Sequence, residues 1–191
     1  MTVSHGAEHF RRLYACSADP WGIAPVPMSR TNNRRTIAAL GERRFRSGFE
    51  PGCSIVVLTR MLATRCDALL AADTVEEPLH AARTLCHDLP RVRFVRLHIP
   101  TRWPHNRFDL IVLSEVLYLL CFRDIATVAA LALAAPYTDG VVLLVNWLGP
   151  GDDPCGGDVA ATMFLNQTHR VLRVASHYHT AQYRSELLVR R

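Results

Sequence analysis

The stretch FDLIVLSEVLYLL (residues 108–120) decides how the rest of the chain is expected to fold. Within it, DLIVL (109–113) continues as an unbroken apolar run after its aspartate, which is typical of a strand covered on both faces. A second run of this kind is VVLLV (141–145). Because such strands occur mainly in parallel sheets with helices on both sides, the sequence predicts an α/β fold.

Apolar and amphipathic stretches alternate along the chain, as they do in sheets of this kind. Five strands are expected near residues 46–50, 68–72, 91–97, 108–113 and 141–146. Helical spacing predicts helices at 57–65, 75–88, 123–135 and 159–167. Two later β-like runs, RVLRVASHYHT and QYRSELLVRR, are close enough to pair as an antiparallel hairpin, which brings the expected count to seven strands.

The N-terminal part is expected to be helical. Helices are predicted at residues 4–17 and 30–46, and SADPWG (17–22) breaks the pattern between them with a proline and a glycine. Ile37, Leu40 and Phe45 are the expected core residues of the second helix.

Composition narrows the classes of function. A chain of 191 residues suits one domain. Its six cysteines are scattered without a CxxC pair, so we expect free thiols and no metal site. All 22 basic residues are arginines and are dispersed, which argues against nucleic acid as a partner. No apolar run reaches the ~18 to 20 residues that span a bilayer, and no secretory signal is evident, so we expect a cytoplasmic protein without membrane contact.

Ligands of open α/β sheets bind outside the carboxyl ends of the strands. After the first predicted strand comes EPGCS (50–54), in which Gly52 would let the backbone approach a ligand closely. Asp73 ends the second strand about 20 residues later, the spacing of an acid that holds ribose hydroxyls. A helix N-cap or a solvated loop aspartate is the alternative interpretation.

Polar residues follow the other strands as well. His98 ends the third strand and is either a ligand contact or a surface histidine. Ser114, Glu115 and Tyr118 follow the fourth strand, where substrate and cofactor would meet. Asn146 and Trp147 end the fifth. The acidic loop behind them has three aspartates that either face a cationic or hydroxylated substrate or are solvated: Asp152, Asp153 and Asp158.

The order of five segments resembles a known family. DPWG (19–22), FEPGCS (49–54), LLAAD (69–73), FDLIVLSEVLYLL and VLLVNWLGPGD (142–152) are similar to the class I S-adenosylmethionine-dependent methyltransferases. Within that family, the chain is more closely similar to the branch of nodulation protein S, an N-methyltransferase acting on an amino sugar. The resemblance implies a Rossmann-like fold, with a seven-stranded, mostly parallel sheet, an antiparallel C-terminal hairpin and helices on both faces. Within one domain (1–191) it implies an N-terminal helical cap (1–46), a cofactor-binding core (47–146) and a substrate-side segment (147–191).

The resemblance also assigns roles to residues, with S-adenosylmethionine as the cofactor. Gly52 and Cys53 would lie against its methionine part, Asp73 would hold the ribose, and Leu97 and His98 would border the adenine. The full expected cofactor set is Tyr14, Trp21, Glu50, Gly52, Cys53, Ser54, Asp73, Thr74, Leu97, His98, Ser114 and Glu115. The candidates for a general base are Glu115, Tyr118 and His98, in that order, and Tyr118, Asn146 and Trp147 would contact the substrate.

Three departures from the family pattern bear on function, one of which is that TVEEP (74–78), after Asp73, lacks the usual small residues. Val56 stands where the family has glycine, and its branched side chain is expected to crowd the nucleoside or to tighten the turn, with strain if φ is positive. Leu97 and His98 replace a common acidic residue. Two functions therefore stay open. One is methyl transfer to an amine or hydroxyl of a small molecule, such as an amino sugar or specialised metabolite. The other is a repurposed fold that performs a non-methylating reaction on a natural-product intermediate or acts as a silent binding subunit.

Overall fold

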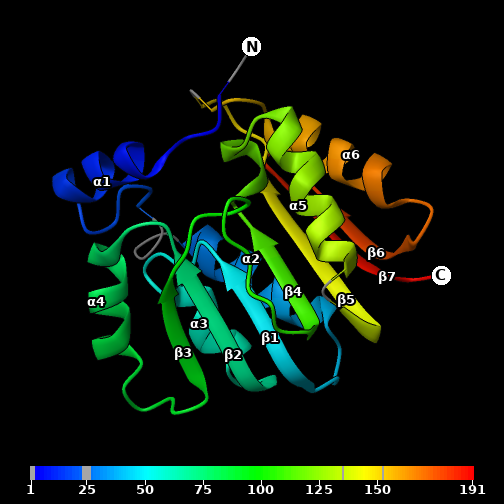
Figure 1. Cartoon of the computed structure of the whole chain (residues 1–191), viewed down its shortest axis with the longest axis horizontal. Coiled ribbons are helices and arrows are strands. Elements are labelled where there is room, and N and C mark those ends of the chain that lie inside the picture. Colours follow the sequence, from blue (N-terminus) through cyan, green and yellow to red (C-terminus); the bar gives the residue numbers. More distant parts are fainter. Residues whose placement is uncertain (1–2, 23–26, 135, 152) are drawn as a thin grey trace.

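The strands form one seven-stranded sheet in the order β3-β2-β1-β4-β5-β7-β6 (Figure 1). The computed structural model describes residues 3–22, 27–134, 136–151 and 153–191. The strands are β1 (Phe45–Pro51), β2 (Cys66–Asp73), β3 (Val92–Arg96), β4 (Phe108–Ser114), β5 (Pro136–Trp147), β6 (Leu172–His179) and β7 (Tyr183–Arg190). Neighbours pair in parallel, except that β7 runs antiparallel to both β5 and β6. The predicted sheet and its C-terminal hairpin are confirmed.

Helices cover both faces of the sheet. They are α1 (Ala7–Cys16), α2 (Pro27–Ala39), α3 (Val57–Leu62), α4 (Glu76–Leu85), a short 3-10 helix η1 (Leu117–Leu119), α5 (Phe122–Ala134) and α6 (Gly157–Thr168). Successive residues of β4 point to opposite sides: Leu110 and Val112 pack with α2 and α3, and Ile111 and Leu113 pack with α5 and α6. Figure 1 shows α5 in front of the sheet and α2 and α3 behind it. This two-sided burial explains the unbroken apolar run of β4.

The second predicted helix ends earlier than expected, and residue 45 already belongs to β1. Gly41 follows α2 with φ 61, and its N–H donates to the carbonyl of Ala38, a helix end that a left-handed glycine favours. The expected core residues are nevertheless correct, because Ile37, Leu40 and Phe45 lie in one buried cluster with residues of α3 and the sheet.

The N-terminal segment lies over the carboxyl ends of the strands. Phe10 and Tyr14 of α1 pack against Val75, just before α4, and Leu119 of η1 borders the same cluster. The backbone N–H of His5 donates to the carbonyl of Leu119 at 3.0 Å. This segment therefore forms a wall above the edge of the sheet where ligands of α/β proteins bind.

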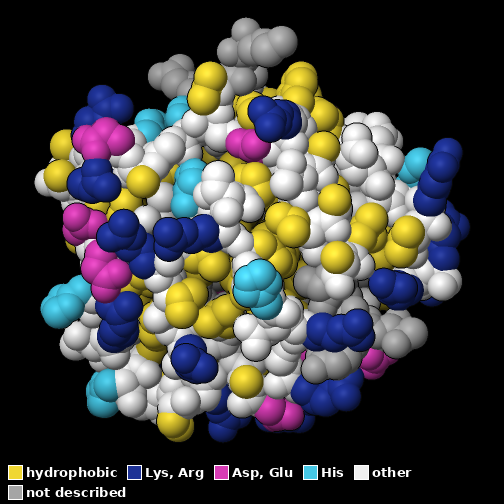
Figure 2. Space-filling model, viewed as in Figure 1, with side chains coloured by type: hydrophobic (Ala, Val, Ile, Leu, Met, Phe, Trp, Pro, Cys, Tyr) yellow, Lys and Arg dark blue, Asp and Glu magenta, His cyan; other side chains and the backbone are white. Residues whose placement is uncertain are grey.

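The surface agrees with the dispersed arginines of the sequence. On the face in Figure 2, arginine side chains lie singly or in small groups among other side chains rather than in one stripe. Within the described ranges, no helix is long and apolar enough to cross a membrane.

Candidate active site

A cavity of about 400 Å³ lies at the carboxyl ends of β1, β2 and β4, beneath the N-terminal segment. Its volume falls within the range of small-molecule sites. Fourteen of the fifteen predicted site residues line it: Tyr14, Trp21, Glu50, Gly52, Cys53, Ser54, Asp73, Thr74, Leu97, His98, Ser114, Glu115, Tyr118 and Trp147. The sequence thus predicted the position of the cavity closely.

Asn146 is the exception, because the structure does not place it at the cavity. Its side chain is fully buried and does not line the cavity. Successive residues of β5 alternate in direction, so that Trp147 reaches the cavity while Asn146 lies beneath the start of α6, beside Gly157.

The loop after β1 is held tightly against the neighbouring strand. Gly52 has φ 80, and the N–H groups of Gly52 and Cys53 both donate to the carbonyl of Ala72, at 2.7 and 2.9 Å. A Cβ on Gly52 would lie 2.4 Å from Cγ1 of Val116. Only glycine fits there, which leaves the backbone of the loop bare towards the cavity.

Val56 does not crowd the cavity, so that part of its prediction is wrong. The residue is 2% exposed, and its side chain packs under the loop against Ala82 and Cys86 rather than lining the cavity. The expected backbone strain is present, because Val56 has φ 59 and ψ 16. A left-handed conformation costs a residue with a Cβ roughly 1–2 kcal/mol.

Asp73 ties the loop to the end of β2. Its carboxylate accepts hydrogen bonds from the backbone N–H of Ser54 at 3.1 Å and of Val75 at 3.3 Å. Burial raises the pKa of Asp73 to about 6, although these hydrogen bonds oppose the shift. Since the residue is 6% exposed, the interpretation as a solvated aspartate is wrong.

Glu50, at the end of β1, carries a second buried carboxylate. One of its oxygens, Oε2, has no hydrogen-bond partner among the described residues. Burial raises the pKa of Glu50 to about 8, and the neighbouring Thr59 opposes this only in part. A buried oxygen without a partner is costly, and this one belongs to a residue that lines the cavity.

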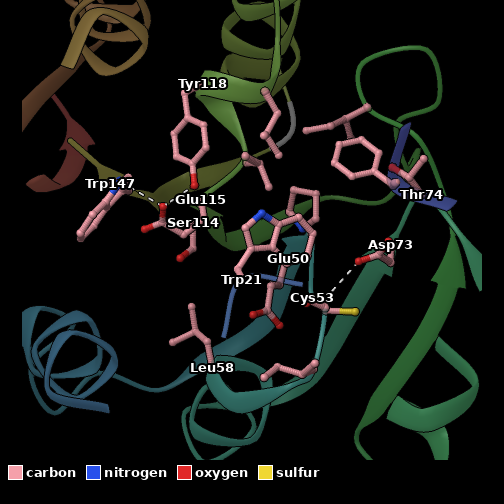
Figure 3. Close-up of a pocket in the computed structure, with 18 of the residues that line it drawn as sticks. Trp21, Glu50, Cys53, Leu58, Asp73, Thr74, Ser114, Glu115, Tyr118 and Trp147 are labelled. Carbon is pink, nitrogen blue, oxygen red and sulfur yellow. Dashed lines mark hydrogen bonds between the residues drawn. The ribbon is translucent and has the colours of Figure 1, made fainter. Parts of the chain in front are cut away.

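His98 lies on the β2–β3 side of the cavity. Its Nδ1 is 3.1 Å from the Thr74 hydroxyl, and burial lowers its pKa, which favours a neutral imidazole at neutral pH. In Figure 3, Asp73 and Thr74 lie across the cavity from Tyr118 and Trp147. His98 therefore groups with the predicted cofactor residues rather than with the other candidate bases.

Glu115 organises the opposite end of the cavity. Its Oε2 accepts hydrogen bonds from the Tyr118 hydroxyl at 2.6 Å and from the backbone N–H of Trp147 at 3.0 Å (Figure 3). Burial raises the pKa of Glu115, against the effect of its hydrogen bonds. The residue has φ 58, so the chain adopts an unfavourable backbone conformation at the point that carries this carboxylate.

Sequence reasoning missed three polar residues from α2 and β7 that line the cavity: Asn32, Asn33 and Tyr183. Tyr183 pairs in register with Trp147, and the two rings meet edge to face at 6.1 Å. The N-terminal residues His5 and Phe10 also line the cavity without having been predicted. Helical spacing placed Phe10 on a helix but gave no sign of what that helix covers.

Two aspartates of the acidic segment, Asp153 and Asp158, have basic partners in the structure. His5 Nε2 lies 3.5 Å from Asp153, and Arg184 contacts Asp158 at 2.6 Å. Asp152 lies outside the described residues. Among the residues that the structure describes, no group of histidines, cysteines and acids is arranged to hold a metal ion.

Comparisons with known proteins agree with this geometry. Residues 6–134 match the family model for nodulation protein S, NodS. The nodulation protein S of Rhizobium tropici is 28% identical over 103 residues, which are 53% of this chain and 43% of that protein. The aligned part spans less than half the length of the curated relatives that the chain matches.

Solved structures extend the likeness over most of the chain. A putative methyltransferase from Pseudomonas syringae is 33% identical with a TM-score of 0.74, over 85% of this chain and 99% of that one. The N-methyltransferase NodS from Bradyrhizobium japonicum WM9, in complex with S-adenosyl-L-homocysteine, is 18% identical with a TM-score of 0.83, over 96% and 97% of the two chains. At 18% identity, the similarity to the NodS structure shows a shared fold and no more. Because the family model covers more than half of the 191 residues, the chain belongs to the nodulation protein S family, and its fold is that of the class I S-adenosylmethionine-dependent methyltransferases.

Proposed function

We propose that the protein transfers a methyl group from S-adenosylmethionine to the nitrogen of a small amine. One observation carries this proposal above the rest: a single cavity joins the loop at Gly52 and Asp73 to the buried carboxylate of Glu115. The loop at Gly52 and the carboxylate of Asp73 suit a nucleoside cofactor. The carboxylate of Glu115 suits an acceptor that must lose a proton.

The residues of the first end fit the cofactor. Its amino group would find a partner in the unpaired oxygen of Glu50, and its methionine part would lie against the bare backbone of Gly52 and Cys53. The ribose would face Asp73, and the adenine would lie by Leu97 and His98. The remaining expected contacts, Tyr14, Trp21, Ser54, Thr74 and Ser114, border the same space. When bound, S-adenosylmethionine supplies an electrophilic methyl group on a sulfonium, so the protein has mainly to align the acceptor and take its proton.

Glu115 is the proposed general base, and Tyr118 holds its carboxylate by the hydrogen bond at 2.6 Å. A carboxylate with a raised pKa is matched to the proton of an ammonium group far better than to that of an alcohol. This match favours an amine over a hydroxyl as the acceptor. His98, on the other side of the cavity, is proposed as a cofactor contact and not as the base.

The main argument for the alternative, a repurposed fold that no longer methylates, does not hold. It rested on a valine that would fill the nucleoside site, and the Val56 side chain lies under the loop instead. No contact in the described residues favours a non-methylating reaction over methyl transfer.

Calorimetric titration with S-adenosylmethionine and S-adenosyl-L-homocysteine tests the proposal. We expect micromolar dissociation constants for the wild type and a loss of at least tenfold in Asp73→Ala. The matched control is Asp67→Ala, which removes an exposed carboxylate paired with Arg44 at the other end of β2. Absence of binding to either compound by the wild type would refute the proposed function.

A further inference from the structure

The acceptor end of the cavity contains a hydrogen-bond network with one unfilled position. Two hydrogen bonds to the Glu115 carboxylate, from the Tyr118 hydroxyl and from the backbone N–H of Trp147, go to the same oxygen, Oε2. The Tyr183 hydroxyl also interacts with this carboxylate, and its hydrogen bond lowers the pKa of Glu115 against the effect of burial. The other oxygen, Oε1, is buried and makes no hydrogen bond with the described residues. A buried carboxylate oxygen normally has a partner, so this one points to a donor that arrives with the ligand or moves when it binds.

Tyr183 is placed to be that donor. It enters the cavity from β7, opposite Trp147 on β5, and cross-strand neighbours of this kind present their side chains on the same face. Burial raises the pKa of Tyr183, and the adjacent charge of Glu115 raises it further. The phenol therefore stays protonated near neutral pH and keeps a hydrogen to donate.

Asn32 fixes the Tyr183 hydroxyl from the other side. Its side chain is 7% exposed, comes from α2 and lines the same cavity. The hydrogen bond between Asn32 and Tyr183 lowers the pKa of the phenol, against burial. Three elements, α2, β4 and β7, thus converge on one hydroxyl beside the free oxygen of Glu115.

We propose that Tyr183 contacts the acceptor nitrogen and relays its proton to Oε1 of Glu115, so that this end of the cavity is a subsite for a primary or secondary amine arriving as its ammonium form. The proposal rests on the proposed methyl transfer. Because Oε1 is shielded from solvent, the acceptor reaches it through the phenol rather than directly. The aromatic rings of Tyr118, Trp147 and Tyr183 suit an acceptor with a flat apolar body.

The proton transfer is balanced. An N–H bond of the ammonium breaks and its proton passes to the Tyr183 oxygen, while the phenolic proton passes to Oε1. The acceptor becomes a neutral amine with a free lone pair, Tyr183 is again a phenol, and Glu115 becomes a neutral carboxylic acid. After the reaction, Glu115 returns its proton to solvent by the same route.

The test uses methyl transfer from radiolabelled S-adenosylmethionine to benzylamine, with benzyl alcohol as the matched acceptor without nitrogen. We expect turnover of benzylamine alone, and a fall in kcat of about 100-fold in Tyr183→Phe, as for loss of general acid–base catalysis. Tyr178→Phe is the control, because that hydroxyl contacts the exposed Arg35 outside the cavity.

A double-mutant cycle separates a relay from a purely structural role. In a Glu115→Gln background, Tyr183→Phe should cost less than threefold, because the proton then has nowhere to go. Equal losses in both backgrounds would overturn the relay. Asn32→Ala should also lower kcat, by a smaller factor, and this loss should likewise shrink in the Glu115→Gln background. This variant keeps the test valid if Tyr183→Phe does not fold.

Binding of S-adenosyl-L-homocysteine and methylation of the two acceptors together distinguish failure of this proposal from failure of the proposed methyl transfer. If S-adenosyl-L-homocysteine does not bind the wild type, methyl transfer itself is wrong. If it binds with equal affinity to wild type and Tyr183→Phe but benzylamine is not methylated, or if benzyl alcohol is methylated equally well, only the amine subsite is wrong.

Discussion

Three residues other than glycine have a left-handed backbone, among those that the structure describes: Ser54, Val56 and Glu115. All three lie at the carboxyl ends of β1 and β4, around the cavity or just beneath it. Each costs roughly 1–2 kcal/mol relative to an ordinary conformation. Backbone strain therefore gathers at the residues that shape the site, which supports a functional reason for it.

Replacing Val56 by glycine tests what that side chain does. The change relieves the strain but removes a buried side chain worth about 1.5–3 kcal/mol and adds the flexibility of glycine to the unfolded chain. We expect Val56→Gly to lower the free energy of unfolding by about 1–2 kcal/mol in urea denaturation. Its dissociation constant for S-adenosyl-L-homocysteine should stay within threefold of wild type, and a gain of tenfold or more would show that the valine obstructs the site after all.

Gly52 is expected to respond in the opposite way. A Cβ there would lie 2.4 Å from Val116 in a backbone with φ 80, so Gly52→Ala must displace the loop or η1 behind it. We predict at least a tenfold loss of affinity for S-adenosyl-L-homocysteine by calorimetry. Gly156→Ala is the control, because a Cβ at Gly156 has no atom within 4 Å, and equal effects of the two changes would contradict the prediction.

At the scale of elements, α1 borders the cavity and is joined to the loop after β1 by a hydrogen bond. The Tyr14 hydroxyl donates to Oγ of Ser54 at 2.8 Å, and the exposed ring of Trp21 packs edge to face against Tyr14 at 5.6 Å. Trp21 also lines the cavity, so its fluorescence should report on ligand binding.

Tyr14→Phe removes this hydrogen bond and keeps the ring. Since one such bond contributes about 0.5–1.5 kcal/mol, we expect S-adenosyl-L-homocysteine to dissociate about 2- to 10-fold faster. Stopped-flow measurement of tryptophan fluorescence follows the release, since Trp21 and Trp147 both line the cavity. An unchanged dissociation rate would mean that α1 does not retain the ligand through Ser54.

The helices and strands also show which parts of the fold and of the candidate site can be predicted from the sequence. Buried strands leave apolar runs that are local in the sequence, so β4 and β5 and the polar residues at their ends, such as Glu115 and Trp147, were found. Tyr183 was not, because its place opposite Trp147 depends on the pairing of β5 with β7, which no local pattern records. The direction of the Val56 side chain likewise depends on α4, which packs against it from outside the loop.

For the whole molecule, buried carboxylates set the response of stability to pH. Burial raises the pKa of Glu50 to about 8 and that of Asp73 to about 6, above the values of 4.5 and 3.8 for the free groups. Between the free and folded values, the folded protein binds more protons than the unfolded chain. The contribution of these groups to stability is therefore most favourable at low pH and falls as pH rises, from about 4 to 6 for Asp73 and from about 4.5 to 8 for Glu50.

Glu50→Gln removes the larger part of this effect. Relative to wild type, the variant should gain about 2–4 kcal/mol in free energy of unfolding between pH 5 and pH 8, because its side chain is never charged. Denaturant unfolding at the two pH values measures the difference. Glu42→Gln, which changes a fully exposed carboxylate, should show no such gain, and parallel behaviour of the two variants would contradict the burial argument.

The sheet order has a consequence for the course of synthesis. A ribosome makes β6 before β7, yet among the strands that the structure describes β6 pairs only with β7, which joins it to β5. Strands β1 to β5 can assemble as they emerge, whereas β6 must wait for its partner and then dock with it as a hairpin. Tyr183 arrives with that hairpin. The proposed cofactor end of the cavity can thus be complete while the nascent protein still lacks Tyr183, one of the residues proposed to contact the acceptor.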